Sequence, residues 1–262
     1  WSDLNNERDE ARAIQVREKI RRQNIRLTVG CIYSGRLPGL FPKWVSNIAR
    51  SLTFAGLFEP AEIVVVDNSP DRGSFEFLSS NIAVYQNVFP NFQVIQWPTK
   101  IHWSSEIERR KSVASFMAEA SNVILERSRG DIIWLCEDDI LVPSLACDQL
   151  IEALVSGDVP VHAISGIYRN RHRPTDLVFG DINNAGDVQE YRFGSFVGRG
   201  LNPIEADVSG TGCLMFWKNR PQTPKKFFWN FGNVAAHDWR WCHDLRQSHG
   251  KLLVHCGVHC GH

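Results

Sequence analysis

Three consecutive acidic residues, Glu137, Asp138 and Asp139, are the part of this sequence best suited to chemistry. They directly follow the segment 131–136, which is apolar after its first residue and has the composition of a buried strand. Adjacent carboxylates repel one another, and a half-buried carboxylate is costly unless it is paired or bound to a cation. Mg²⁺ or Mn²⁺ carrying a diphosphate would meet this need, because both ions prefer oxygen ligands. A solvated acidic turn that caps the next helix is the alternative.

A Gly-Thr-Gly turn opens the strand-like segment 206–217. Gly210 and Gly212 lack a Cβ atom, so the backbone there can approach a bound ligand closely. A bulge or a tight hairpin would need the same glycines for conformational reasons. The turn is therefore a candidate for substrate contact, with a structural role as the alternative.

The C-terminus is rich in metal-binding residue types: His255, Cys256, His259, Cys260 and His262. Together with Cys242, they suggest a zinc site. The spacing, however, contains no Cys-x-x-Cys pair. Zinc therefore remains an open alternative for this segment.

Basic residues at 109–111 open a helix that is expected over 105–128. Positive side chains are unfavourable at a helix N-terminus, where the backbone dipole already attracts anions. A bound diphosphate would justify them, and a solvated helix face is the alternative.

The elements that must position these residues alternate between strands and helices. Apolar runs predict strands over 26–33, 61–66, 92–97 and 131–136, and three-to-four spacing predicts helices over 42–55 and 105–128. This alternation favours a mostly parallel α/β sheet. Later strand-like pieces separated by Gly, Pro, Asn and Asp indicate a more antiparallel second half, followed by a helix over 237–248 and a last strand: 161–169, 176–181, 190–197, 206–217 and 251–255.

Two segments in order, Ile-Val-Val-Val-Asp-Asn-Ser over 63–69 and Gly-Asp-Ile-Ile-Trp-Leu-Cys-Glu-Asp-Asp over 130–139, resemble the GT-A glycosyltransferases. The inverting family 2 type is the most similar, and the resemblance covers about residues 25–262. It implies a Rossmann-like, mostly parallel sheet flanked by helices. It also implies Mn²⁺- or Mg²⁺-dependent transfer of a sugar, with inversion, from a nucleoside-diphosphate sugar such as a UDP- or GDP-sugar to a glycan or other hydroxyl acceptor.

The resemblance places several residues at the nucleotide. Asp67 matches the acid that reads the nucleobase, and Asn68 follows it where glycine or a second acid is more usual. Arg110 lies near a position at which an arginine contacts the nucleotide. Glu137 replaces the first acid of the metal-binding D-x-D motif, and Asp138 is expected at the ribose or the sugar.

Further residues are implied at the metal and the reacting sugar. Asp139 is expected as the direct metal ligand, and His262 as a second ligand that follows the last strand. Gly212 lies in the segment expected under the donor sugar. Asp238 matches the general base of inverting members, with His237 as a rival base and a helix N-cap as the alternative role for Asp238.

The composition is that of a globular protein of 262 residues, with 29 basic and 29 acidic side chains. A net charge of zero argues against a nucleic-acid partner. No apolar run reaches the roughly 20 residues that span a bilayer. Seven dispersed cysteines favour the reducing cytoplasm over a disulfide framework.

The N-terminal segment 1–24 reads as a charged helix or linker leading into a catalytic domain over 25–262. The chain lacks an initiator methionine, so we expect it to be part of a larger multidomain protein.

Two other functions remain open. A sugar-phosphate nucleotidyltransferase would use the same nucleotide, but its Gly-rich phosphate loop would have only a poor counterpart in residues 30–36. A zinc-stabilised binding module without catalysis is the second alternative.

Overall fold

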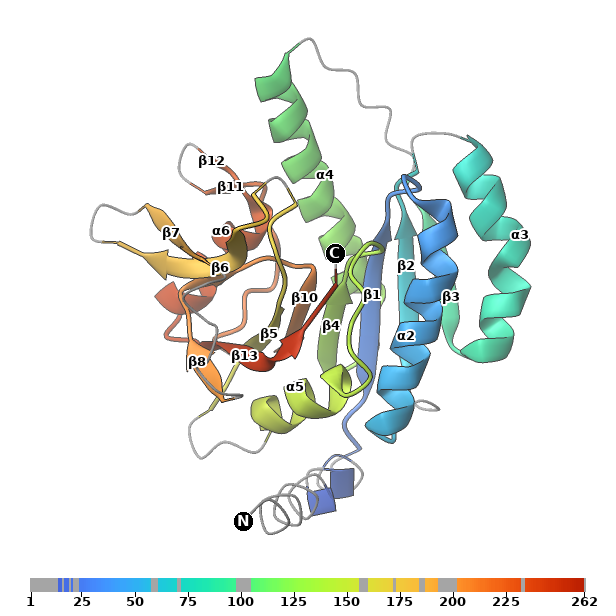
Figure 1. The fold of residues 1–262 in the computed structure, drawn as a ribbon, viewed down its shortest axis with the longest axis horizontal. Helices are drawn as coiled ribbons and strands as arrows, with labels where there is room; N and C mark the ends of the chain where they lie inside the picture. The colour runs from blue at the N-terminus through green and yellow to red at the C-terminus, as the bar shows by residue number, and fades with distance from the viewer. Residues whose placement is uncertain are drawn as a thin grey trace.

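The computed structural model has an α/β architecture, with a mixed sheet between helices on both faces (Figure 1). It describes residues 14, 15, 17, 18, 20, 24–57, 61–69, 72–97, 105–155, 160–171, 173–183, 187–192, 202–231 and 234–261.

The first half of the main sheet is parallel, as predicted. Its strands lie in the order β3-β2-β1-β4. The side chains of β1, β2 and β4 are buried along their whole length, which explains their continuous apolar sequences. The bounds are β1 (Leu27–Tyr33), β2 (Glu62–Asp67), β3 (Phe92–Gln96) and β4 (Ile132–Cys136).

The second half is more antiparallel, which confirms that prediction. β10 runs antiparallel between β4 and β5, β13 is parallel to β5, and β8 is an antiparallel edge. Its bounds are β5 (Ala163–Ile167), β8 (Pro203–Glu205), β10 (Cys213–Trp217) and β13 (Leu252–His259). A smaller antiparallel sheet and a hairpin complete it: β6 (Asp176–Ile182), β7 (Val188–Arg192) and β9 (Val208–Ser209), then β11 (Asn230–Phe231) and β12 (Val234–Ala235).

Helices cover both faces of the main sheet. A short 3-10 turn η1 (Pro38–Leu40) leads into α2 (Phe41–Phe54), which shares one core cluster with α3 (Arg72–Val88) and α5 (Ala146–Val155). On the other face α4 (Glu106–Arg127) and α6 (His237–Gln247) share a second core cluster. The predicted helices correspond to α2, α4 and α6.

Two helices, α3 and α5, were not predicted from the sequence. Among the described side chains of α3, only Leu78 and Tyr85 are buried, and Ile82 and Val88 are partly buried against the same core. α5 is only 10 residues long. Both helices form because the sheet offers an apolar face to cover.

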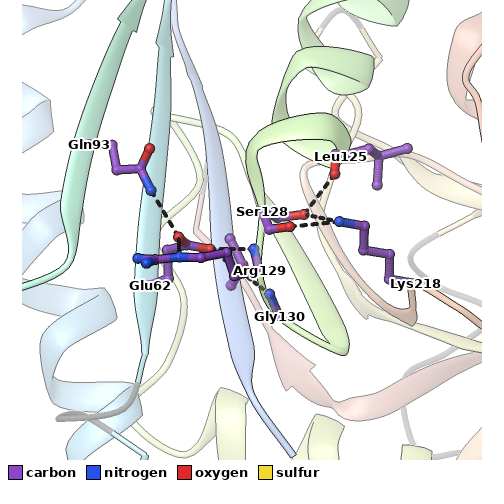
Figure 2. A network of polar contacts seen from close by, with 8 residues as sticks. Glu62, Gln93, Leu125, Ser128, Arg129, Gly130 and Lys218 are labelled. Carbon is purple, nitrogen blue, oxygen red and sulfur yellow. Dashed lines mark hydrogen bonds and ion pairs between the residues drawn. The ribbon is translucent and has the colours of Figure 1, made fainter.

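A buried carboxylate ties the amino ends of the strands together (Figure 2). Glu62 at the start of β2 accepts hydrogen bonds from Thr28 Oγ1 at 2.7 Å and Gln93 Nε2 at 2.8 Å. The backbone N–H and the Nε of Arg129 donate to the same carboxylate at 2.8 and 2.9 Å. Beside it, Lys218 Nζ donates to the Ser128 carbonyl at 2.6 Å. These bonds connect β1, β2, β3 and the turn before β4.

Part of the predicted N-terminal helix lies outside the described residues. Residues 14, 15, 17, 18 and 20 are helical, and Ile20 is buried in the core of α2, α3 and α5. Arg17 forms an ion pair of 3.0 Å with Asp148 of α5. In the described parts of the chain, none of the helices has the length and apolarity that crossing a membrane requires.

Candidate active site

The carboxyl end of β1 holds together the two segments on which the resemblance depends. Tyr33, the last residue of β1, accepts a hydrogen bond from the Asn68 backbone N–H at 2.8 Å. The next residue, Ser34, donates from its backbone N–H and its hydroxyl to Asp138 Oδ2 at 2.8 and 2.9 Å. The ends of β2 and β4 therefore meet at the end of the strand between them, as expected for parallel strands.

Asp67 is the last residue of β2 and is buried. Its Oδ1 accepts hydrogen bonds from the Ser69 backbone N–H at 2.8 Å and the Ser69 hydroxyl at 2.6 Å. This local turn orients the carboxylate at the edge of the sheet.

A third segment reaches the acidic run through the Gly-Thr-Gly turn. The Glu137 backbone N–H donates to the Gly212 carbonyl at 3.2 Å, and Thr211 Oγ1 donates to Glu137 Oε1 at 3.1 Å. His237 Nε2 lies 3.3 Å from the same hydroxyl. With the Thr211 proton on the bond to Glu137, the Thr211 oxygen can accept a hydrogen bond from Nε2 of His237. The start of α6, with Asp238, is thus connected to the end of β4.

The side chain of Tyr168 packs against the Gly-Thr-Gly turn at 210–212. Its hydroxyl accepts a hydrogen bond from the Gly212 backbone N–H at 2.9 Å. A Cβ atom at Gly212 would lie 2.7 Å from the Tyr168 Cζ, and one at Gly210 would lie 2.1 Å from its hydroxyl. The two glycines are therefore required because the aromatic ring packs against the backbone, which is a structural reason for them.

The electrostatics of the site are those of a carboxylate cluster that is poorly solvated. Burial raises the pKa of Glu137 above its ordinary value, and the charges of Asp238 and Asp138 add to the rise, while the Thr211 hydrogen bond and Arg171 oppose it. Burial also raises the pKa of Asp138, against the hydrogen bonds from Ser34. These carboxylates would gain from a further cation.

His237 is buried, and burial lowers the pKa of its imidazole in spite of the nearby Asp238 charge. Asp238 is only partly buried and accepts a hydrogen bond from the Trp239 backbone N–H at 2.9 Å. The alternative that Asp238 is the N-cap of α6 is wrong, because the N-cap residue is Ala236, which makes no side-chain cap bond. Asp238 is instead in the first turn of α6.

Asp139 lies in the wall of a cleft of about 680 Å³ and forms an ion pair with Arg171. The cleft lies between the loop after β1, the end of β5 and the end of β13; Leu37, Tyr168 and Gly261 are among its lining residues. Gly261 exchanges two backbone hydrogen bonds of 2.9 Å with Leu141. The last strand thus reaches the segment that carries Asp139.

The carboxylates of Glu137, Asp138 and Asp139 are an all-oxygen donor set, which suits Mn²⁺ or Mg²⁺. Burial, together with the charges of Asp238 and Asp138, raises the pKa of Glu137, and a bound cation would favour its ionised form. Within the described residues, no group of three or more His, Cys, Asp or Glu side chains is close enough to hold a metal by itself. Phosphate oxygens and water would therefore have to supply further ligands, as is usual for Mg²⁺. The predicted ligand His262 lies outside the described residues.

The predicted nucleotide residue Arg110 lies apart from these contacts. It is exposed in the first turns of α4 and pairs with Glu106 at 3.2 Å. This pair neutralises charge on the helix surface, and it accounts for Arg110 without a ligand.

Several solved structures are similar to this chain in fold. A structure of GalNAc-T7 with UDP, GalNAc and Mn²⁺ matches with a TM-score of 0.55 and 13% identity, over 91% of this chain and 44% of that chain. The mannosyltransferase PcManGT from Pyrobaculum calidifontis, in complex with GDP-Man and Mn²⁺, matches with a TM-score of 0.55 and 14% identity, over 96% and 64%. S. aureus TarS 1-349 matches with a TM-score of 0.55 and 11% identity, over 90% and 60%.

The chain has the GT-A fold. The chain spans only 44 to 64% of the length of these structures. No protein-family model and no curated protein sequence matches it. At identities of 11 to 14%, the comparisons establish the GT-A fold, and the chemistry must be argued from the side chains.

Three residues at the site of this GT-A fold were not predicted from the sequence, namely Ser34, Thr211 as a side-chain partner, and Tyr168. Ser34 had a usable signal, because it is the first residue after an apolar strand at the ligand-binding edge. Thr211 lies between two noted glycines. Tyr168 had no local signal, since its contact with Gly212 joins residues far apart in the chain.

Proposed function

We propose that this chain is a metal-dependent glycosyltransferase that moves a sugar from a UDP- or GDP-sugar to an acceptor hydroxyl with inversion. The observation that carries the proposal is the meeting of three acidic segments, at Asp67, at 137–139 and at Asp238, on the carboxyl edge of a GT-A sheet. The two neighbours whose structures hold UDP or GDP-Man with Mn²⁺ support the donor class and the ion.

In the proposed reaction, the acceptor oxygen forms a bond to the anomeric carbon while the bond from that carbon to the diphosphate oxygen breaks. Asp238 takes the proton of the acceptor hydroxyl. His237 is less suited, because burial keeps it neutral and its Nε2 can donate to Thr211. Asp67 and Asn68 would hold the nucleobase, and Gly212 would lie under the donor sugar.

Asp139 would bind the ion together with His262, with Glu137 and Asp138 beside it toward the ribose and sugar. The bound ion would act as a Lewis acid and neutralise the departing diphosphate. Arg110 remains a proposed contact to the nucleotide. Release of Asp139 from Arg171 would accompany binding.

We further propose that residues 25–262 form the catalytic domain of a larger protein, led by the segment 1–24. The cytoplasm is the proposed compartment, because all seven cysteines are free thiols and six of them are buried.

A thermal-shift panel of UDP, GDP and their sugars, with and without Mn²⁺, tests the proposal. We expect one nucleotide with Mn²⁺ to raise the melting temperature by about 5–10 °C at 100-fold excess over its Kd. Asp139→Asn should lose this shift, while the matched control Asp187→Asn, an exposed acid before β7, should keep it.

Two results would contradict the proposal. A chain that responds to no nucleoside diphosphate or nucleotide sugar has no donor site. A chain that responds to nucleoside triphosphates and releases pyrophosphate with a sugar phosphate is a nucleotidyltransferase.

A further inference from the structure

Two exposed aromatic side chains, Phe228 and Trp229, are adjacent in the segment that leads into β11. Phe228 is 49% exposed and Trp229 is 39% exposed. Elsewhere in the described parts of the chain, the one other exposed aromatic side chain is Phe54, at the end of α2. Aromatic rings are mostly buried in folded proteins, and exposed apolar side chains that lie together mark a binding surface.

The backbone that carries the two rings is anchored. The preceding residue, Phe227, is buried, and its N–H donates to Asn122 Oδ1 of α4 at 2.7 Å while its carbonyl accepts from Asn122 Nδ2 at 3.0 Å. The Phe227 ring stacks on Trp241 of α6 with a centroid separation of 5.4 Å. On the other side of the two rings, β11 pairs with β12. A ligand would therefore meet a surface that is already ordered, which lowers the entropic cost of binding.

The aromatic pair borders the end of α6 that carries the proposed base. The hairpin of β11 and β12 runs directly into the start of α6 (Figure 1). Its register places Trp229, the residue before β11, level with Ala236, the residue before α6. Asp238 follows two residues later, and the Phe227 ring lies 6.2 Å from the imidazole of His237. A molecule that rests on the exposed rings would thus lie beside the residue expected to take its proton.

The two rings differ in what already covers them. Arg240 of α6 lies over Phe228, with its Cζ 5.6 Å from the ring centroid, and its Nε donates to both oxygens of Asp244 at 2.9 Å. This cation–π contact orients the Phe228 ring. None of the other described rings or cations contacts the Trp229 ring. Trp229 is therefore the ring that a ligand can cover.

We propose that Trp229, with Phe228 beside it, stacks against a pyranose ring of the acceptor, and that the acceptor is a glycan. A pyranose has a face of C–H groups that packs on a flat aromatic ring, and its hydroxyls remain at the edge, where one can face Asp238. An acceptor at this position needs both features, an apolar face and a hydroxyl. The proposal rests on the glycosyltransferase function proposed above: the aromatic pair selects the acceptor and Asp238 takes its proton.

Binding of the whole chain to a glycan array, with and without UDP or GDP and Mn²⁺, tests the proposal, and calorimetry with a bound glycan gives its Kd. We expect at least one type of glycan to bind, and Trp229→Ala to weaken that binding about tenfold or more. Trp229→Phe keeps a flat ring and should retain most of the affinity. Phe54→Ala, which removes an aromatic ring of similar exposure from α2, is the matched control and should bind as the parent does. Melting curves establish that each variant is folded.

Three outcomes would overturn the proposal. A chain that responds to a nucleotide but binds no glycan does not use a saccharide acceptor. Glycan binding that Trp229→Ala leaves unchanged would place the acceptor elsewhere, and an equal loss in Phe54→Ala would show apolar attraction without a site. Glycan binding without any response to a nucleotide would retain the aromatic site but reject its role as an acceptor site, and so reject the glycosyltransferase function separately.

Discussion

The ring of Tyr168 lies against the turn that presents Thr211, so the two glycines of that turn leave no room for a side chain. Gly210→Ala would place a Cβ atom 2.1 Å from the Tyr168 hydroxyl and 2.6 Å from Val178 Cγ1. We expect a loss of about 1–3 kcal/mol in the free energy of unfolding, measured by urea denaturation. In a Tyr168→Phe background the closest atom is gone, and the same substitution should cost less. Strictly additive losses would mean that the ring does not limit this turn.

Conservative substitutions can distinguish the role of the proposed base, Asp238, from that of its neighbour His237. Asp238→Asn keeps the size of the side chain but removes its ability to take a proton, so the turnover number should fall about 10²- to 10⁴-fold. His237→Gln can retain a donor toward Thr211 and should reduce turnover less than tenfold. Nucleotide binding with Mn²⁺ serves as the control for both. The reverse order of effects would make His237 the base.

At the scale of elements, Glu62 joins β2 to β1, β3 and the turn before β4. Burial raises the pKa of Glu62, but the bonds from Arg129 and Thr28 outweigh it and lower the pKa below 4.5. In the folded protein the Glu62 carboxylate therefore stays ionised at pH values at which the same side chain is protonated in the unfolded chain. The resulting stabilisation is complete above about pH 4.5 and is lost as the pH falls through the folded-state pKa.

Glu62→Gln should consequently reduce the free energy of unfolding at pH 7 by about 1–3 kcal/mol. The difference from the parent should shrink as the pH falls below 4.5, because the parent loses the same charge. Denaturant titrations across this range measure it, with Glu205→Gln on the edge strand β8 as the control. Glu205 is 67% exposed in its pair with Lys251 and should contribute at most about 1 kcal/mol. A difference that does not change with pH would mean that the charge is unimportant.

At the scale of the whole molecule, the proposed donor site joins the ends of β2 and β4, two strands that are separated in the sheet by β1. Nucleotide with Mn²⁺ should therefore slow amide hydrogen exchange in 67–69 and in 137–139 together, and EDTA should reverse both effects. The amides at the amino ends of the strands, such as Arg129, should exchange as before. Protection of only one of the two segments would mean that they do not form a common site.

Local sequence was sufficient for much of this architecture. The continuous apolar runs of β1, β2 and β4 follow from burial on both faces, and the stripe on α2 follows from burial on one. The acids at the ends of β2 and β4 could be recognised because they interrupt those runs. These features depend on neighbours in the chain, and for that reason the sequence alone determined the parallel strands, the helices α2 and α4 and the candidate acids.

Tertiary structure decided which of these residues meet. Asp138 lies 104 residues from Ser34, Glu137 lies 74 residues from Thr211, and the choice of such partners has no periodic signal. The same holds for α3, whose Leu78 and Tyr85 pack in the core that α2 and α5 share. It also holds for the pairing of Arg171 with Asp139. Contacts of this kind are set by how whole elements pack, because only packing brings distant segments within the short range of a hydrogen bond.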